Sequence, residues 1–374
     1  MEHLNSNVEG RHPGQRLLYI IHVDWSAPTK GRPQLLAQAL AEHFDIKVLH
    51  RRDFRPGAIP EHFGIKNSPV LALPLERWKA IRLINRLLFR IQLFVTLALW
   101  RPEIVWITHP RFTPPRSWRR IFSCKWVYDC MDDLKAFGGI NVEAAKGEPA
   151  LLRQVDMVVS SAQNLAGRLL EAGAAPNRLR VVRNGLRQEW ISSSVQKREP
   201  PLNSKVALYF GALAEWFDFQ VILAALDQIP DLEFHLIGPA YVPVPGHPRL
   251  KLIEAVPHAE LKRLAGVADL LVMPFLLTEL VESVDPVKMY EYVALGPPIV
   301  ARYYPEVEQF RPFTLFYDTE REFISSIRQG LARHIGTSAA ESELRRQFLE
   351  RSTWRARASE LVSFLGELSL QNNR

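Results

Sequence analysis

The stretch DPVKMYEYVALG, at positions 285–296, places charged residues at the start of a predicted amphipathic helix. Asp285 and Pro286 favour a helix start. The N-terminus of a helix presents free N–H groups and a partial positive charge, which suits a phosphate. We therefore predict that Lys288 contacts a diphosphate and that Glu291, three residues on, accepts hydrogen bonds from a ribose diol. The alternative is a capped surface helix with a Lys288–Glu291 pair that contributes only ~0.2–0.5 kcal/mol.

A second candidate loop, FGALAEWFDF at 210–219, follows a predicted strand. Gly211 in this loop would let a phosphate or a sugar approach the backbone closely. A tight turn would need a glycine equally, so both interpretations stay open. In open parallel sheets, ligands bind outside the carboxyl ends of the strands, which is where this loop is expected.

A third candidate, VYDCMDDLKAF at 127–137, has three aspartates close to a predicted strand end. Asp132 or Asp133 could act as a general base that takes a proton from a hydroxyl nucleophile. The competing interpretation is that one of these carboxylates caps a helix.

Several other chemistries are excluded by motifs that the sequence lacks. The dinucleotide motif GxGxxG and the nucleophile elbow GxSxG are absent. There is no D-x-D pair, and Cys124 and Cys130 offer no metal-ligand spacing. We therefore expect neither a metal nor another cofactor, and the two cysteines favour a reducing compartment. The basic residues are not interleaved with aromatic ones, so no nucleic-acid partner is expected.

The elements that must position these residues alternate between strand and helix. Apolar runs at 16–23 and 46–50 flank a helical pattern at 33–44, and a similar series begins again at 205–213. This alternation predicts an α/β protein with two Rossmann-like domains that face a central cleft. The 374 residues also exceed the roughly 250–300 at which a single core stops growing.

The predicted organisation follows from these patterns. It comprises a flexible tail at 1–15, an N-terminal Rossmann-like domain at 16–190, a linker at 191–204, a C-terminal Rossmann-like domain at 205–340, and a C-terminal helix at 341–374 that packs back on the N-terminal domain. The resemblance described below implies that the first domain binds the acceptor and the second the nucleotide sugar. We read the polar first residues as a tail and not as a signal peptide.

Positive charge is concentrated in the first half of the chain. Residues 1–185 hold 27 Lys and Arg against 16 Asp and Glu, whereas residues 186–374 hold 20 against 24. This asymmetry suggests that the first domain has an anionic partner, such as a membrane surface or an acidic substrate. The apolar segment 76–102 also carries basic residues along one helix face, among them Arg82, Arg86 and Arg90.

Segment 76–102 has two interpretations. The first is an interfacial helix whose basic side contacts anionic headgroups, and the second is a core helix with a solvated basic face. A spanning helix is not expected, because the charge-free run 91–100 is too short. We favour the interfacial helix because the whole domain is basic.

Four segments of the second half together resemble GT-B glycosyltransferases close to family 4. They are LYFGALAEWFDF, FHLIGP, DLLVMPF and DPVKMYEYVALGPPIVA. Bacterial enzymes of surface-polysaccharide assembly, of the teichuronic-acid and xanthan glucuronosyltransferase type, are particularly similar. In the first half, GRPQLLAQALAE, VYDCMDD and VRNGL match the same enzymes more loosely.

The resemblance implies roles for individual residues. Lys288 would bind the donor diphosphate, Glu291 the ribose, and Gly211 would line the phosphate and sugar. Phe275, with Met273, would lie near the base, and Asp132 or Asp133 would be the base that acts on the acceptor. Ser283 departs from the family, because many family-4 enzymes have a further glutamate at this position. A retaining mechanism is therefore not carried over.

The sequence thus predicts a metal-independent glycosyltransferase that works at the cytoplasmic face of the cell membrane as a peripheral protein. It would move a sugar from a nucleotide diphosphate donor, UDP-linked, to a lipid-linked or polysaccharide acceptor. The alternatives are a non-catalytic GT-B-like protein that binds a nucleotide sugar or a partner enzyme, and a nucleotide-sugar epimerase.

Overall fold

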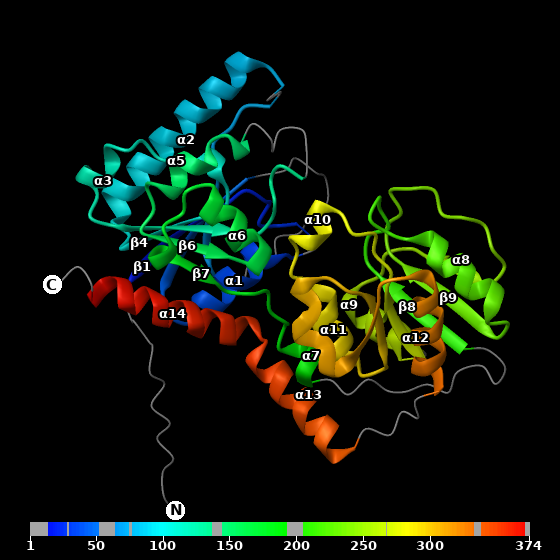
Figure 1. The fold of residues 1–374 in the computed structure, drawn as a ribbon. Helices are drawn as coiled ribbons and strands as arrows, with labels where there is room; N and C mark the ends of the chain where they lie inside the picture. The colour runs from blue at the N-terminus through cyan, green and yellow to red at the C-terminus, as the bar shows by residue number, and fades with distance from the viewer. Residues whose placement is uncertain are drawn as a thin grey trace, which may run out of the picture. The chain divides into compact units, whose positions relative to one another are not determined.

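The computed structural model of the chain divides into two compact units, one of Met1–Arg183 with Trp354–Arg374 and one of Asn184–Thr353. Figure 1 shows the elements of both units. The structure describes residues 14–27, 30–51, 64–74, 77–136, 144–192, 205–266, 268–332 and 338–370. The predicted tail at 1–15 and linker at 191–204 fall almost entirely outside these described residues.

The first unit contains a seven-stranded parallel sheet in the order β3-β2-β1-β4-β5-β6-β7. Its strands are β1 (Arg16–Ile21), β2 (Asp45–His50), β3 (Lys66–Pro69), β4 (Ile104–Ile107), β5 (Lys125–Cys130), β6 (Met157–Ser160) and β7 (Leu179–Val181). Its helices are α1 (Arg32–Leu40), α2 (Lys79–Trp100), α3 (Trp118–Ile121), α5 (Glu148–Leu152), α6 (Gln163–Glu171) and α14 (Trp354–Leu370), with short 3₁₀ turns at Pro110–Phe112 and Pro176–Arg178.

Helices cover both faces of this sheet, and β1 shows why. Its buried side chains alternate, so that Leu17 and Tyr19 join a cluster with α1 and α14, whereas Leu18 and Ile20 join a cluster with α2 and α5. A parallel sheet buried on both faces produces the continuous apolar runs seen in the sequence.

The second unit contains a six-stranded parallel sheet in the order β10-β9-β8-β11-β12-β13. Its strands are β8 (Lys205–Phe210), β9 (Leu232–Ile237), β10 (Leu250–Ile253), β11 (Leu270–Met273), β12 (Ile299–Arg302) and β13 (Thr314–Tyr317). Its helices are α7 (Glu189–Ser192), α8 (Phe219–Gln228), α9 (His258–Ala265), α10 (Glu279–Glu282), α11 (Val287–Leu295), α12 (Glu320–Ala332) and α13 (Ala339–Arg351), with a 3₁₀ segment at Pro305–Phe313.

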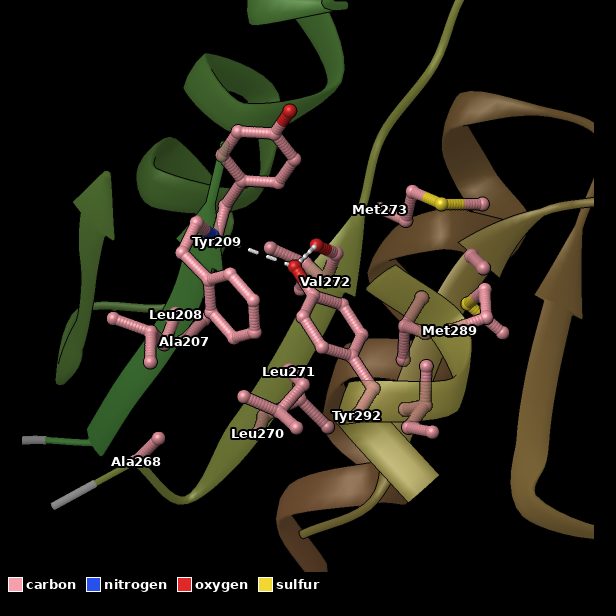
Figure 2. Packing of buried hydrophobic residues seen from close by; sticks show 14 of the residues in the cluster. Ala207, Leu208, Tyr209, Ala268, Leu270, Leu271, Val272, Met273, Met289 and Tyr292 are labelled. Atoms are coloured by element: carbon pink, nitrogen blue, oxygen red, sulfur yellow. Dashed lines mark hydrogen bonds between the residues drawn. The ribbon is translucent and has the colours of Figure 1, made fainter. Parts of the chain in front are cut away.

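Helix α11 is anchored to the two central strands of the second unit through one tyrosine. The hydroxyl of Tyr292 donates to the carbonyl of Val272 at 3.0 Å and accepts from the N–H of Phe210 at 3.5 Å. Figure 2 shows this side chain in the apolar core between β8 and β11. The strand ends and α11 are therefore held in a fixed relation to each other.

The predicted α/β class with two parallel sheets is confirmed. The sequence analysis did not identify β3 or β13. The helical segment predicted from 341 onward is in fact two helices, since α13 ends at Arg351 and α14 begins at Trp354. Helix α14 packs on α1 in the first unit.

Helix α2 carries apolar residues on two sides, one buried and one exposed. One stripe, which includes Phe89, Leu93 and Leu97, is buried against the sheet. Polar residues of the helix also have structural partners: Asn85 bonds both the N–H and the carbonyl of Leu73, at 2.7 and 3.0 Å. In Figure 1, α2 extends beyond the other helices of its unit.

The outward side of α2 is apolar with a basic border. Leu83 is 67% exposed and Leu99 80% exposed, and further large apolar side chains between them are also exposed. By length and composition, α2 is the one described helix that could cross a membrane, although a core helix of a soluble protein would pass the same test. The expected basic stripe is exposed, but apolar residues occupy the centre of the outward surface.

Candidate functional site

The candidate site of the second unit forms where α11 passes the carboxyl ends of β8 and β11. Lys288 lies one turn before Tyr292, on the same helix face, because residues four apart are neighbours on a helix. Since Tyr292 is fixed between the two strands, Lys288 is carried just past their ends. There its side chain lies against Gly211, the first residue after β8.

Gly211 is required at this position for two reasons. Its φ of +138° lies in a region that other residues rarely adopt. In addition, a Cβ atom at this residue would overlap Cε of Lys288 and would lie 2.6 Å from Nζ. A second strand-end glycine, Gly238 after β9, has φ +142°, and a Cβ there would overlap the carbonyl of Gly211. Together the two glycines leave room for the lysine.

Aromatic rings surround the ammonium group of Lys288. Its Nζ lies 5.6 Å from the ring centre of Tyr209 and 5.9 Å from that of Phe275, both within cation–π range. Phe275 is buried just past β11, and its ring centre is 6.1 Å from that of Tyr209. The residues predicted to bind the donor, Gly211, Phe275 and Lys288, are therefore brought together, with Glu291 one helix turn further on.

Lys288 and Glu291 do not pair with each other. Among the described residues, none forms a side-chain hydrogen bond or ion pair with either of them. Burial lowers the pKa of Lys288, which the charge of Glu291 partly offsets. Burial also raises the pKa of Glu291 to about 7, against the pull of Lys288, Arg187 and Lys262. The alternative interpretation, a capped surface helix with a Lys288–Glu291 ion pair, is therefore not observed.

Asp285 has a different role from the N-cap that the sequence suggests. The N-cap of α11 is Pro286, and Asp285 is buried before it. Its carboxylate accepts hydrogen bonds from the N–H of Asn184 at 2.7 Å, from the hydroxyl of Tyr290 at 3.0 Å and from Nε2 of Gln309 at 2.8 Å. Nδ2 of Asn184 also donates to the Asp285 carbonyl at 2.7 Å. The residue thus fixes the segment that leads into α11.

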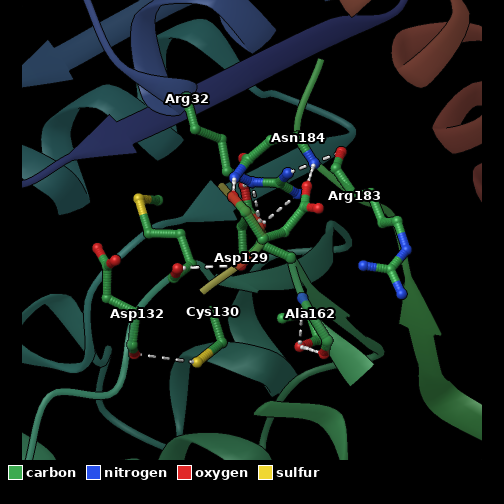
Figure 3. A network of polar contacts seen from close by, with 11 residues as sticks. Arg32, Asp129, Cys130, Asp132, Ala162, Arg183 and Asn184 are labelled. Atoms are coloured by element: carbon green, nitrogen blue, oxygen red, sulfur yellow. Dashed lines mark hydrogen bonds and ion pairs between the residues drawn. The ribbon is translucent and has the colours of Figure 1, made fainter. Parts of the chain in front are cut away.

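In the first unit, three aspartates lie at the end of β5 or just after it, and they differ in whether their carboxylates are already paired. Asp129 is fully buried and paired with Arg32 of α1, whose Nη2 and Nε lie 3.0 and 3.1 Å from Oδ1. Nη1 of Arg32 also donates to the carbonyl of Arg183 at 3.2 Å. Figure 3 shows this network with Asp132 beside it.

The structure separates the two candidate bases. Asp133 is buried, accepts from the N–H of Lys135 at 2.9 Å and lies 3.4 Å from Nε of Arg168. Asp132 is half-buried, and in the described part of the chain no hydrogen bond reaches its carboxylate. Burial raises the pKa of Asp132 to about 6, with Arg32 opposing and Asp129 adding to the rise. Asp132 therefore combines an available carboxylate with a pKa suited to a general base at neutral pH.

The remaining predicted residues, Arg82, Arg86 and Arg90, lie exposed on α2 and apart from Asp132. No group of three or more potential metal ligands occurs among the described residues. Two further residues near Lys288, Tyr209 and Gly238, were not predicted from the sequence. The glycines that follow two neighbouring strands, in YFG and LIG, were the available signal.

Comparison with known proteins adds sequence and structural relatives. No family model matches the sequence. The chain is 22% identical over 292 residues to TuaH of Bacillus subtilis, a protein assigned to teichuronic acid biosynthesis as a glycosyltransferase. The match covers 70% of this chain and 71% of TuaH.

Solved structures with the same arrangement include several sugar transferases. Sucrose-phosphate synthase from Thermosynechococcus elongatus superposes with a TM-score of 0.70 at 16% identity, over 96% of this chain and 100% of that one. HepE from Anabaena, solved with UDP and glucose, has a TM-score of 0.66 at 14% identity and covers 94% and 99%. The chain has the GT-B fold, and the prediction of a GT-B glycosyltransferase similar to those of bacterial surface-polysaccharide assembly is confirmed.

Proposed function

We propose that this glycosyltransferase moves a sugar from a UDP-linked donor to a lipid-linked or polysaccharide acceptor at an anionic membrane surface. The observation that carries the donor half of the proposal is the position of Lys288. Its ammonium group lies beside Gly211 at the strand ends, half-buried, with aromatic rings as its neighbours. A diphosphate would supply the negative charge that this position lacks.

The chemistry of the donor site follows from the leaving group. When the sugar departs, negative charge develops on the diphosphate, and Lys288 with the N-terminus of α11 would stabilise it. Glu291 would accept hydrogen bonds from the ribose diol, and Phe275 would lie near the base. The solved complexes of HepE with UDP and with UDP-glucose support a donor of this class. Because a fold alone does not define a substrate, we base the proposal of a nucleotide diphosphate donor on the position of Lys288 and not on the fold.

On the acceptor side, Asp132 would remove the proton of the attacking hydroxyl. A carboxylate with a pKa of about 6 is largely ionised at neutral pH and still basic enough to accept a proton as the new bond forms. Asp133 would hold the loop through Arg168 and would not take part in the chemistry.

The outward side of α2 supports membrane attachment of the first unit. Its exposed apolar residues would enter the interfacial layer, and the exposed Lys79, Arg82, Arg86 and Arg90 would contact anionic headgroups. Each basic residue near such a surface contributes about 1 kcal/mol. Helix α3 packs beside α2 through Phe94 and Trp118 and adds the exposed Arg119 and Arg120.

The direct test of the donor site is nucleotide release from a panel of nucleotide sugars. Release of UDP by the wild-type protein should fall at least 100-fold in Lys288→Ala, in line with the loss of one transition-state donor. Lys251→Ala is the matched control, because Lys251 lies at the edge strand β10 and pairs with Glu233. Equal release by wild type and Lys288→Ala would exclude Lys288 from the donor site.

A further inference from the structure

Polar residues gather at the carboxyl ends of three neighbouring strands of the first unit. The strand order places β1 between β2 and β4. His22 follows β1, Arg51 follows β2, and His109 and Arg111 follow β4. The N–H of Arg51 donates to the carbonyl of Ile21 at 3.3 Å, so Arg51 is aligned with the end of β1.

The ring of His22 is held at the centre of this group. Its Nδ1 is 3.0 Å from the hydroxyl of Thr108, and its ring centre is 5.0 Å from that of His109. Burial and, to a smaller extent, the charges of Arg111 and then Arg51 together lower the pKa of His22 to about 4. The imidazole is therefore neutral at physiological pH, and the two charged groups that act on it are both positive.

Arg51 and Arg111 follow the two strands that flank β1, and both are exposed. The N–H of Arg111 donates to Nδ1 of His109 at 3.2 Å, and its guanidinium lies 5.6 Å from the ring centre of Phe112. Asp24 is the carboxylate of the loop after β1. Its Oδ1 accepts from the N–H and the hydroxyl of Ser26 and lies 3.7 Å from Nδ1 of His50.

We propose that Arg51 and Arg111, on either side of His22, bind a phosphate or carboxylate group of the acceptor. Guanidinium groups recognise both anions through paired N–H donors. This inference rests on the proposed function, since it describes the substrate of the same unit that holds Asp132. It also accounts for part of the positive charge of residues 1–185 that α2 does not explain.

A single acceptor molecule could contact both Asp132 and the polar residues around His22. Asp132 follows β5, and β4 lies between β1 and β5. Two strand spacings amount to about 10 Å. An oligosaccharide or a glycosylated lipid diphosphate can bridge that span with its hydroxyl at Asp132 and its anionic group at the arginines. An acceptor bound in this way would carry its phosphate or carboxylate group near its reactive end.

His22 provides a local reporter for the test. In the full-length protein, the imidazole signal of His22, assigned with His22→Gln, is titrated by NMR with and without inorganic pyrophosphate or glucuronate. A bound anion within hydrogen-bonding range of the arginines should raise the pKa of His22 by about one unit or more. The rise should disappear in Arg51→Gln/Arg111→Gln and persist in Arg153→Gln, an exposed arginine of the same unit.

The two probes identify the source of the anion. A response to pyrophosphate alone indicates a lipid diphosphate or a phosphate, whereas a response to glucuronate alone indicates an acidic sugar. No response to either probe, or an equal response in the double arginine variant, would overturn the inference. Lys288→Ala separates this result from the donor site, because the His22 response should be unchanged there even where nucleotide release is lost.

Discussion

Lys288 of α11 lies directly over the α-carbon of Gly211, although the two residues are 77 positions apart in the sequence and belong to different elements. The contact depends on the positive φ of Gly211 and on Tyr292, which holds α11 to β8 and β11. A residue with a side chain at 211 would occupy the space of the lysine. The position of the cation is therefore set by two uncharged residues, a glycine and a tyrosine.

Gly211→Ala should reduce nucleotide release almost as much as Lys288→Ala does. The new methyl group displaces the flexible end of Lys288, and the strained φ lowers the free energy of unfolding by about 1–3 kcal/mol. Steady-state release of UDP and urea unfolding measure the two effects. Gly246→Ala is the control, since a Cβ there meets no atom within 4 Å.

The double variant Gly211→Ala/Lys288→Ala shows whether the alanine acts through the lysine. If it does, the double variant should be about as active as Lys288→Ala alone, because coupled residues are not additive. A further loss of the same size as that of Gly211→Ala would mean that residue 211 affects the donor by another route.

Glu291→Gln should stabilise the protein at high pH and not at low pH. The pKa of Glu291 is raised to about 7 in the folded state, so folding favours the protonated form and stability falls as pH rises from about 4.5 to 7. Glutamine removes this loss of stability but also removes the attraction to Lys288. The free energy of unfolding at pH 8 is therefore expected to rise by roughly 1–2 kcal/mol. Urea unfolding at pH 4.5 and pH 8 checks the difference, and equal effects at both would contradict it.

Asp285→Asn distinguishes a buried network from a helix cap. Loss of an N-cap costs about 0.5–2 kcal/mol. Loss of a buried carboxylate that accepts from Asn184, Tyr290 and Gln309 should cost more, about 3 kcal/mol, because hydrogen bonds to charged groups are strong and their donors are left buried. Asp269→Asn, which affects a half-buried carboxylate bonded to the N–H of Val206, should cost about 1 kcal/mol. Urea unfolding of both variants provides the comparison.

The fold was predictable because its signals are local, and so was the place of Lys288 and Glu291 at the start of a helix. Apolar runs define the buried strands. The sequence around residue 286 indicates a helix start, which placed Lys288 and Glu291 in the first turns of a helix. Strand β3 was not predictable, since Lys66–Pro69 is a short edge strand that is exposed or half-buried along its length. Its continuation is held by Asn85 and Gln92 of α2, residues that the sequence shows only as polar interruptions.

Other parts of the site depend on contacts between distant residues. Asp285 was interpreted as a cap because its partner Asn184 is 101 positions away. Asp132 and Asp133 are adjacent in sequence, and the contacts of Asp133 with Arg168 of α6 and with the N–H of Lys135 distinguish the two carboxylates. The residues around His22 could be grouped only from the strand order β2-β1-β4, because no motif connects His22, Arg51 and the segment 108–111 along the chain.

Asp132→Asn should remove the acidic limb of the pH profile of sugar transfer. As a base with a pKa of about 6, Asp132 acts only when deprotonated, so kcat should fall tenfold per pH unit below that value. The variant should lose 10²–10⁴-fold in kcat and show no such limb. Transfer to membrane lipid is measured at saturating donor, which keeps the titration of Glu291 out of the profile.

Asp133→Asn is the matched control for this experiment. It should lower stability, because it removes one of the two carboxylates that pair with Arg168 and the charged acceptor for the N–H of Lys135, while the acidic limb near pH 6 remains. If the limb disappears in Asp133→Asn and persists in Asp132→Asn, the assignment of the base is reversed.

Attachment to vesicles should depend separately on the apolar and basic residues of α2. Leu83, Leu87 and Ile91 are 53–67% exposed, and burial of their surface in the interfacial layer does not depend on salt. Attraction of Arg82, Arg86 and Arg90 to anionic headgroups is screened by salt. Co-sedimentation with vesicles of phosphatidylglycerol and phosphatidylcholine should therefore fall at every salt concentration in Leu83→Ser/Leu87→Ser/Ile91→Ser. In Arg82→Gln/Arg86→Gln/Arg90→Gln it should fall chiefly at low salt.

The control variants for attachment lie on other surfaces of the same unit. Leu170→Ser changes a 41% exposed leucine of α6, and Arg153→Gln removes an exposed charge at the end of α5. Neither should alter sedimentation, because neither residue belongs to the surface proposed to meet the headgroups. Binding that is equal in all four variants would mean that α2 does not contact the membrane. Binding that survives the arginine changes but not the leucine changes would leave an apolar contact without preference for anionic lipid.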